Sequence, residues 1–129
     1  MPGYRNLEVY RLSYELALDI FALVKRFPAS ERFSLSDQIL RSSRGVVANL
    51  VEGYRKRQYP RQFAAKCADA DGEACETQLW LDFARDFGYL DADPHASFTE
   101  RYERVGRLLG AMIAAPDKYA PRSHPPGRR

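Results

Sequence analysis

The sequence contains few of the side chains that usually perform catalysis or bind metals. Its 129 residues include only two histidines and two cysteines. His95 and His124 are far apart, and neither lies at ligand spacing from another histidine or a cysteine. The sequence also lacks a glycine-rich phosphate loop, a G-x-S-x-G motif and a Cys/His pair with an orienting partner. We therefore predict that the protein has no cofactor and no metal site, and that it is not an enzyme.

An acidic run at residues 67–75, CADADGEAC, matches a calcium-binding loop only in part. When Gly72 is aligned with the sixth position of an EF-hand loop, Asp69 and Asp71 occupy positions three and five. The first and twelfth positions, where the motif requires carboxylates, are then Cys67 and Gln78. We interpret the run as an acidic turn of a helix.

A pair of carboxylates is the remaining catalytic candidate. Glu52 would lie beside Glu73 or Glu76 if their two helices pack together, and paired carboxylates can exchange protons with a substrate. No neighbouring residue indicates a substrate for such a pair.

The chain also lacks a long apolar segment. None of its apolar runs approaches the roughly 18–20 residues that span a bilayer, and the start, MPGYRNLEVYRL, is broken by charges. If Cys67 and Cys75 lie on one helix, they are about 12 Å apart along its axis. A disulfide requires Cα atoms within about 7 Å, so we expect two free thiols. We predict a cytoplasmic protein without a membrane partner.

Helical periodicity dominates the sequence, and sustained period-2 alternation is absent. Helix ends are marked by Pro60 at a first-turn position, by Gly88 at a C-terminal cap position, and by Asp93 followed by Pro94. Short links between long helices favour antiparallel neighbours. The sequence therefore predicts an all-α fold, an antiparallel up-down-up-down four-helix bundle over residues 1–116, with helices at 7–27, 31–57, 60–87 and 94–115.

The first predicted helix, 7–27, is apolar over more of its surface than one bundle face requires. Its apolar side chains cover an arc of roughly 240°, and a narrow arc carries the charged residues. A bundle of four helices has no central helix that would be buried all round. We therefore predict that a second face of this helix packs against another subunit.

The second predicted helix, 31–57, carries a line of polar or small residues opposite its apolar face. We call this line the polar seam; it consists of Gln38, Arg41, Gly45, Asn49 and Glu52. A glycine costs about 1 kcal/mol relative to alanine within a helix, so its presence indicates a close approach to the backbone. The seam is expected to pack against the third helix or a neighbouring subunit, and the alternative is an ordinary solvated face.

Positive charge is concentrated near the turn between the second and third helices. Residues 41–66 hold seven basic residues and one acidic residue, whereas residues 67–100 hold one basic and nine acidic. The candidate nucleic-acid contacts are Arg55, Lys56, Arg57, Arg61 and Lys66. The same charges also complement the C-terminal end of a helix dipole, so both interpretations are open. Any binding to phosphates is expected to be sequence-tolerant and salt-sensitive.

The end of the chain, residues 117–129, reads DKYAPRSHPPGRR. It is rich in proline and arginine and has no apolar period. We predict a disordered basic tail.

The run QILRSSRGVVANLVEG, residues 38–53, resembles a family signature that reads approximately Q-I-R-R-A-A-x-S-I-x-x-N-I-A-E-G. That signature belongs to the four-helix-bundle family of 23S rRNA-intervening-sequence proteins. The positions that match outright are Gln38, Ile39, Arg41, Asn49, Glu52 and Gly53. Further similarity occurs in ETQL at 76–79 and GYL at 88–90, while Gly45 replaces a serine and Ala74 a glutamate.

The resemblance implies an antiparallel four-helix bundle that assembles into a ring-like homopentamer. A related accessory protein of diversity-generating retroelements forms a basic pentameric barrel that binds nucleic acid and a reverse transcriptase. The family has no established catalytic activity. We therefore expect a non-enzymatic oligomeric scaffold whose partners are further copies of the same chain, with RNA or DNA binding as the alternative.

Overall fold

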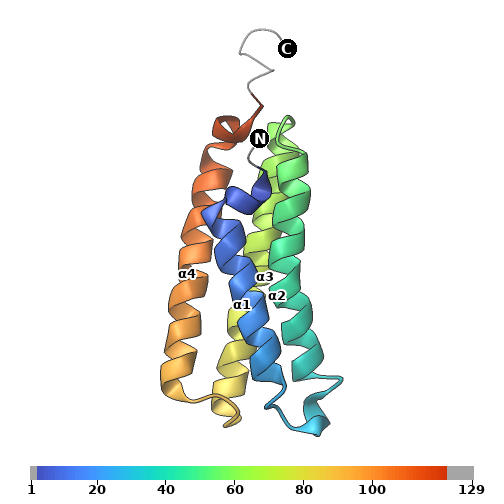
Figure 1. The fold of residues 1–129 in the computed structure, drawn as a ribbon, viewed down its shortest axis with the longest axis vertical. Coiled ribbons are helices and arrows are strands. Elements are labelled where there is room, and N and C mark those ends of the chain that lie inside the picture. Colours follow the sequence, from blue (N-terminus) through green and yellow to red (C-terminus); the bar gives the residue numbers. More distant parts are fainter. Residues whose placement is uncertain (1–2, 122–129) are drawn as a thin grey trace.

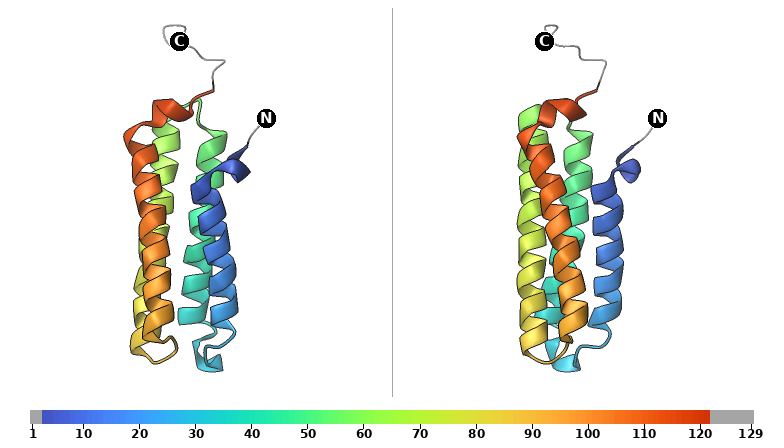
Figure 2. Two further views of the ribbon diagram at one scale, coloured as in Figure 1. Left: turned by 60° about the vertical axis from the view of Figure 1, so that its left-hand side comes forward. Right: turned by 90° about the vertical axis from the view of Figure 1, so that its left-hand side faces the viewer.

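The computed structural model describes residues 3–121 and contains four long helices (Figure 1). They are α1 (Glu8–Val24), α2 (Leu35–Arg55), α3 (Pro60–Asp86) and α4 (Ala92–Ala114). Each helix runs antiparallel to the next, and the described chain begins and ends at the same end of the bundle (Figures 1 and 2). Residues 3–121 contain no strand, so the predicted all-α four-helix bundle is confirmed.

The link between α1 and α2 is longer than the sequence predicted. α1 ends at Val24 rather than at residue 27, and α2 begins at Leu35 rather than at residue 31. A short 3-10 helix, Ala29–Glu31, lies between them. The Leu35 N–H donates a hydrogen bond to Glu31 Oε1 (3.3 Å), and the Tyr89 hydroxyl donates one to Glu31 Oε2 (2.8 Å). Glu31 therefore caps α2 from outside it, which is why the helix begins later.

The end of α3 follows the predicted glycine cap. Gly88 has a φ of 84°, in the left-handed region that glycine adopts without strain. The Gly88 N–H bonds to the Arg85 carbonyl (3.0 Å), and the Tyr89 N–H bonds to the Ala84 carbonyl (2.8 Å). This pair of bonds is a Schellman motif, which satisfies carbonyls at the helix end and reverses the chain into α4.

The start of α4 differs from the prediction by two positions. The helix begins at Ala92, with Asp91 rather than Asp93 at the N-cap position. Pro94 is thus the third residue of the helix. It is tolerated there because the first-turn N–H groups have no acceptor inside the helix.

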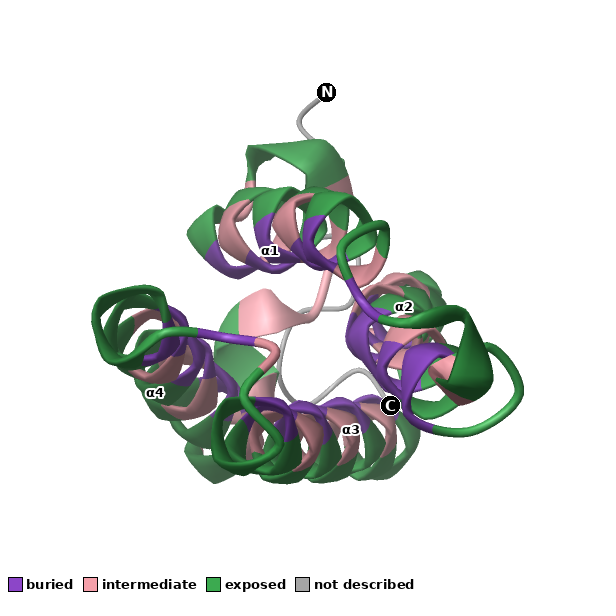
Figure 3. Ribbon diagram, turned by 90° about the horizontal axis from the view of Figure 1, so that it is seen from below, coloured by how far each residue is buried: buried purple, intermediate pink, exposed green. Residues whose placement is uncertain are grey.

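The core is most tightly built between α2 and α3, which make the most extensive contact of any two helices. Small residues allow the approach: Ala70 and Ala74 of α3 are buried, and so are Ser42 and Gly53 of α2. A hydrogen bond of 2.8 Å from the Thr77 hydroxyl to the Ser42 hydroxyl joins the two helices in the interior. The four helices follow one another around the bundle, so α2 lies between α1 and α3 (Figure 3).

The first residues of the predicted tail are ordered. Pro116–Tyr119 form a 3-10 helix, and the Tyr119 ring lies 5.4 Å from that of Phe63, centroid to centroid. The prediction of a disordered tail from residue 117 is therefore wrong at its start, because Tyr119 packs against the bundle. Residues 122–129 lie outside the described part of the chain. None of the helices in the described part is both long and apolar enough to cross a membrane.

Candidate interaction surfaces

One side of α1 exposes apolar side chains that residues 3–121 leave uncovered. Tyr14 and Phe21 are each 47% exposed and Leu18 is 55% exposed. Together with Ala17, also of α1, and Arg44 of α2, they line a concavity of about 340 Å³. We call this surface, formed by these five residues, the α1/α2 face. This face contains the second apolar arc predicted for α1. The expectation that another subunit covers the arc stays a prediction.

A second apolar surface lies on the other side of α2. Trp80 and Phe83 of α3, and Phe87 directly after its end, line a concavity of about 250 Å³ with Leu35 and Gln38 of α2. Phe83 is 41% and Phe87 53% exposed, and the three rings follow one another at centroid distances of 6.0 and 5.6 Å. Their spacing of three and four residues forms one helical stripe, a pattern that is visible in the sequence but was not predicted as a surface.

The polar seam is only partly gathered in one place. Gln38 reaches the aromatic concavity, whereas the Arg41 Nε pairs with Asp37 Oδ2 (3.1 Å) on an exposed part of α2. Asn49 donates from Nδ2 to the Gly45 carbonyl (2.9 Å), which is a bond within α2. Glu52 pairs across to Lys66 of α3 (3.1 Å).

At Gly45 the chain makes the closest approach of the seam. A Cβ at this position would collide with the carboxylate of Glu73, which lies directly over the glycine. Burial raises the pKa of Glu73, and the nearby carboxylates of Glu76 and Asp69 raise it further by repulsion and by a hydrogen bond with Glu76. The carboxylate pair is therefore Glu73 with Glu76, and Glu52, which we had considered for that role, pairs with Lys66 instead.

We define the α2/α3 face as the surface that combines this acidic pair with the aromatic stripe. Its members are Gln38, Gly45, Glu73, Glu76, Trp80, Phe83 and Phe87. The α1/α2 and α2/α3 faces lie on adjacent sides of the bundle and share α2 as their common edge (Figure 3).

Of the basic residues around the α2–α3 turn, two are engaged by other groups of the bundle and three are exposed. Arg57 donates from Nη1 to the Tyr54 carbonyl (3.0 Å) and stacks its guanidinium 4.2 Å from the Tyr54 ring centroid. This contact fits the helix-capping interpretation, because a cation here meets the negative end of the α2 dipole. Lys66 is neutralised by Glu52. Arg55, Lys56 and Arg61 are exposed.

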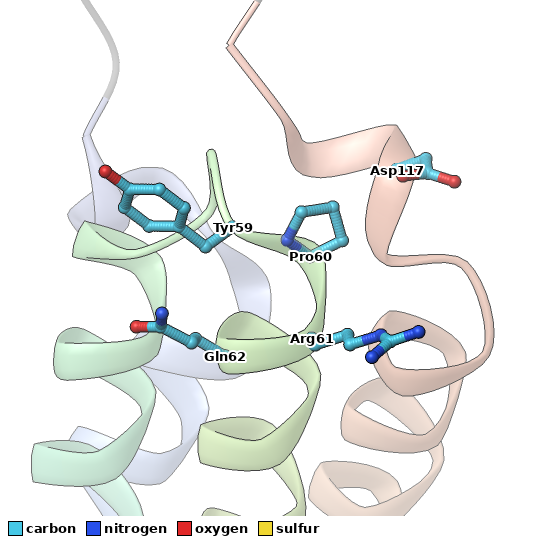
Figure 4. Close-up of a pocket in the computed structure, with 5 residues that line it drawn as sticks. All are labelled: Tyr59, Pro60, Arg61, Gln62 and Asp117. Carbon is cyan, nitrogen blue, oxygen red and sulfur yellow. The ribbon is translucent and has the colours of Figure 1, made fainter. Parts of the chain in front are cut away.

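Arg61 borders a concavity at this end of the bundle. Tyr59, Pro60, Arg61 and Gln62 surround a space of about 670 Å³ together with Asp117 of the C-terminal 3-10 helix (Figure 4). Tyr59 is 51% exposed, so one face of its ring is open to a stacking partner. The aspartate on the other side places a negative charge near Arg61.

Side chains capable of chemistry are few in the described structure. His95 Nε2 lies 2.7 Å from Asp82 Oδ1 and 3.5 Å from Arg85 Nη1, and this contact joins α3 to α4. Cys67 is buried and Cys75 is exposed, and both are free thiols. Residues 3–121 hold no group of three or more side chains arranged to bind a metal ion.

The fold and these surfaces define an antiparallel four-helix-bundle protein with two uncovered apolar faces on either side of one helix. The chain belongs to the family of 23S rRNA-intervening-sequence proteins, whose family model matches residues 5–111. No curated protein is significantly similar to it.

One solved structure supports the same membership. It is the crystal structure of a protein with unknown function from the S23 ribosomal protein family of Bacteroides thetaiotaomicron VPI-5482. The two chains are 30% identical and superpose with a TM-score of 0.74, over 81% of this chain and 97% of the other. The bundle is therefore shared by a relative along nearly all of that relative's length.

Proposed function

We propose that the protein is a non-enzymatic helical scaffold whose copies assemble into a closed ring, with five copies as the number that the family resemblance implies. The observation that carries this proposal is the pair of uncovered apolar faces on adjacent sides of α2. We also propose a cytoplasmic location, because a reducing compartment keeps thiols such as Cys67 and Cys75 free.

The relative position of the two faces supports a ring rather than a two-fold dimer. The faces differ in chemistry, so contact between one face and the other is head-to-tail. Adjacent sides of a four-helix bundle meet at about a right angle, and a head-to-tail contact with that geometry closes after roughly four to six copies. A closed ring covers both apolar faces on every copy.

Light scattering on the purified protein tests this proposal. We expect a particle several times the 14.8 kDa protomer mass at micromolar concentration. Leu18→Asp places a charge in the centre of the α1/α2 face and is expected to give a monomer with unchanged helical content. Ala111→Asp, at an exposed position of α4, is the matched control and is expected to leave the particle intact. A wild-type monomer would overturn the proposal.

A second candidate function is sequence-tolerant binding of RNA or DNA at the α2–α3 turn. The supporting observation is the combination of three exposed cations, Arg55, Lys56 and Arg61, with the half-exposed ring of Tyr59. Cations attract phosphates, and an open aromatic face stacks on bases of any sequence. A ring would bring several copies of this patch to one end.

Fluorescence anisotropy with mixed-sequence RNA and DNA oligonucleotides tests this function. Binding at about 50 mM salt that weakens steeply as salt rises is the expected result. Arg55→Glu combined with Lys56→Glu should weaken binding at least tenfold. A control with the same change in charge, Arg104→Glu with Arg107→Glu on α4, should have a much smaller effect. Absence of binding at about 50 mM salt would exclude this candidate.

A further inference from the structure

Arg44 stands alone in the α1/α2 face. It is exposed, and within residues 3–121 it makes no ion pair and no side-chain hydrogen bond. Its surroundings are the apolar side chains of Tyr14, Leu18 and Phe21. Its guanidinium is therefore free to pair with a carboxylate from outside the protomer.

The α2/α3 face offers the opposite arrangement. Glu73 and Glu76 are three residues apart on α3, so their carboxylates lie on one side of the helix, and burial, Glu76 and Asp69 together raise the pKa of Glu73. Neither glutamate forms an ion pair within the described residues, and Lys66 and Arg41 are engaged by Glu52 and Asp37. The two faces of one chain are thus complementary in charge.

The two charged groups also lie at the same height along the bundle. Glu73 contacts Gly45, and Arg44 is the residue next to Gly45. Copies that stand side by side in a closed ring are not shifted along the ring axis, so groups at equal height meet across each contact. In a ring whose bundles stand parallel to its axis, Arg44 of one copy would therefore face Glu73 of the next.

The apolar groups follow the same order on both faces. α1 and α3 run in the same direction, towards the lower end of the bundle in Figure 1. Phe21 follows Leu18 by one turn in that direction on the α1/α2 face, and Trp80 and Phe83 follow Glu73 in that direction on the α2/α3 face. A parallel arrangement of copies matches charge with charge and apolar surface with apolar surface, whereas an inverted copy would not.

We propose that Arg44 of one copy pairs with the Glu73–Glu76 carboxylates of the next copy, and that this pair sets the parallel register of the assembly. This inference rests on the proposed ring and names the contact that aligns it. A guanidinium presents several N–H donors in a fixed plane, which suits it to bridge two carboxylates whose mutual repulsion it relieves.

Charge reversal tests the pair. Arg44→Glu and Glu76→Arg are both at exposed positions, and each single variant places like charges at the contact. Each is expected to weaken assembly at least tenfold, measured as the dissociation constant from sedimentation. The double variant Arg44→Glu/Glu76→Arg restores an opposite-charge pair between positions 44 and 76, with Glu73 left in place, and should assemble at least tenfold more tightly than either single variant. Arg107→Glu and Glu103→Arg, on α4, are the matched controls and should assemble as wild type does.

The outcomes separate this inference from the ring itself. If wild type assembles and either single variant at position 44 or 76 assembles equally well, the pair is wrong and the ring stands. If both singles fail and the double variant fails as well, while its circular dichroism remains that of wild type, the pairing is also overturned. A monomeric wild type would remove the ring on which the inference rests.

Discussion

Two glycines of α2 contact α3 in different ways. A Cβ at Gly45 would meet only the end of the flexible Glu73 side chain. A Cβ at Gly53 would lie 2.9 Å from the Cβ of Lys66 and 3.5 Å from the Phe63 carbonyl oxygen, both of which are held by the backbone of α3. The first neighbour can move aside and the second cannot, so the two positions should respond differently to the same substitution.

We expect Gly53→Ala to lower the free energy of unfolding by roughly 1–3 kcal/mol, because α2 must move away from α3 to relieve the overlap. Gly45→Ala should leave the free energy unchanged or raise it by up to about 1 kcal/mol, because alanine favours the helix and Glu73 can rotate away. Urea unfolding in the Leu18→Asp background measures both without a contribution from assembly. Equal destabilisation by the two substitutions would contradict this reading of the contacts.

The two thiols should differ in reactivity. Burial raises the pKa of Cys67 to about 11, so at pH 8 almost none of it is thiolate, and no reagent reaches it in the folded chain. Cys75 is exposed, with its pKa raised by partial burial and by Asp71. Timed alkylation at pH 8 should modify Cys75 first and Cys67 only after urea is added.

Cys75→Ser serves as the control for that experiment, since it should leave a folded protein that takes up no label. Rapid labelling of Cys67 in the folded state would show that α3 opens locally.

The glycine pattern of α2 predicted a close approach, and the structure identifies what approaches. Sequence spacing placed Gly45, Asn49 and Glu52 on one side of the helix, but it could not assign their neighbours. Glu52 pairs with Lys66 rather than lying beside a carboxylate, because opposite charges attract. Which side chain of α3 lies beside Glu52 depends on the position of α2 along α3. Helical periodicity determines which side of its own helix a residue occupies. The position of one helix along another is set by the packing of the whole core, which local periodicity does not reveal.

The Glu31 carboxylate joins three elements near the lower end of the bundle. It lies in the 3-10 helix of the α1–α2 link, caps α2 through the Leu35 N–H, and accepts a hydrogen bond from Tyr89 in the α3–α4 link. We expect Glu31→Ala to lower the free energy of unfolding by roughly 1 kcal/mol, as loss of a helix cap does. Glu31→Gln keeps an acceptor oxygen and should retain part of that stability in urea unfolding.

Ser30→Ala, at the exposed neighbouring position, is the control for this substitution and should behave as wild type. An unchanged unfolding midpoint for Glu31→Ala would show that the 3.3 Å bond to Leu35 contributes nothing.

The four helices were predictable because their apolar residues repeat at helical spacing over several turns, and proline and glycine mark the ends of α3. The length of the link from α1 to α2 was not predictable, because residues 25–34 continue the helical pattern without a breaker other than Pro28. Its 3-10 helix is joined to the α3–α4 link by a hydrogen bond between Glu31 and Tyr89, which are distant in sequence. Interactions of that kind leave no local periodicity.

For the assembled protein, mixing the two charge-reversal variants reports the number of copies. Arg44→Glu and Glu76→Arg chains can alternate so that every contact pairs opposite charges, but a closed ring alternates perfectly only when its number of copies is even. A five-membered ring retains one repulsive contact. We therefore expect the equimolar mixture to assemble less tightly than the double variant, as measured by sedimentation.

Equal assembly of the mixture and the double variant would instead indicate an even number of copies. Native mass spectrometry of either sample provides an independent count.

The position of the chain ends has a practical consequence. With two helices running each way, the first and last described residues return to one end of the bundle, the end that also carries the α2–α3 turn (Figure 1). If the proposed ring forms, a reporter protein fused at either end would be displayed in several copies on a single side of it. The opposite side, with the α1–α2 and α3–α4 links, would stay free for attachment to a surface, so the orientation of an immobilised ring can be chosen in advance.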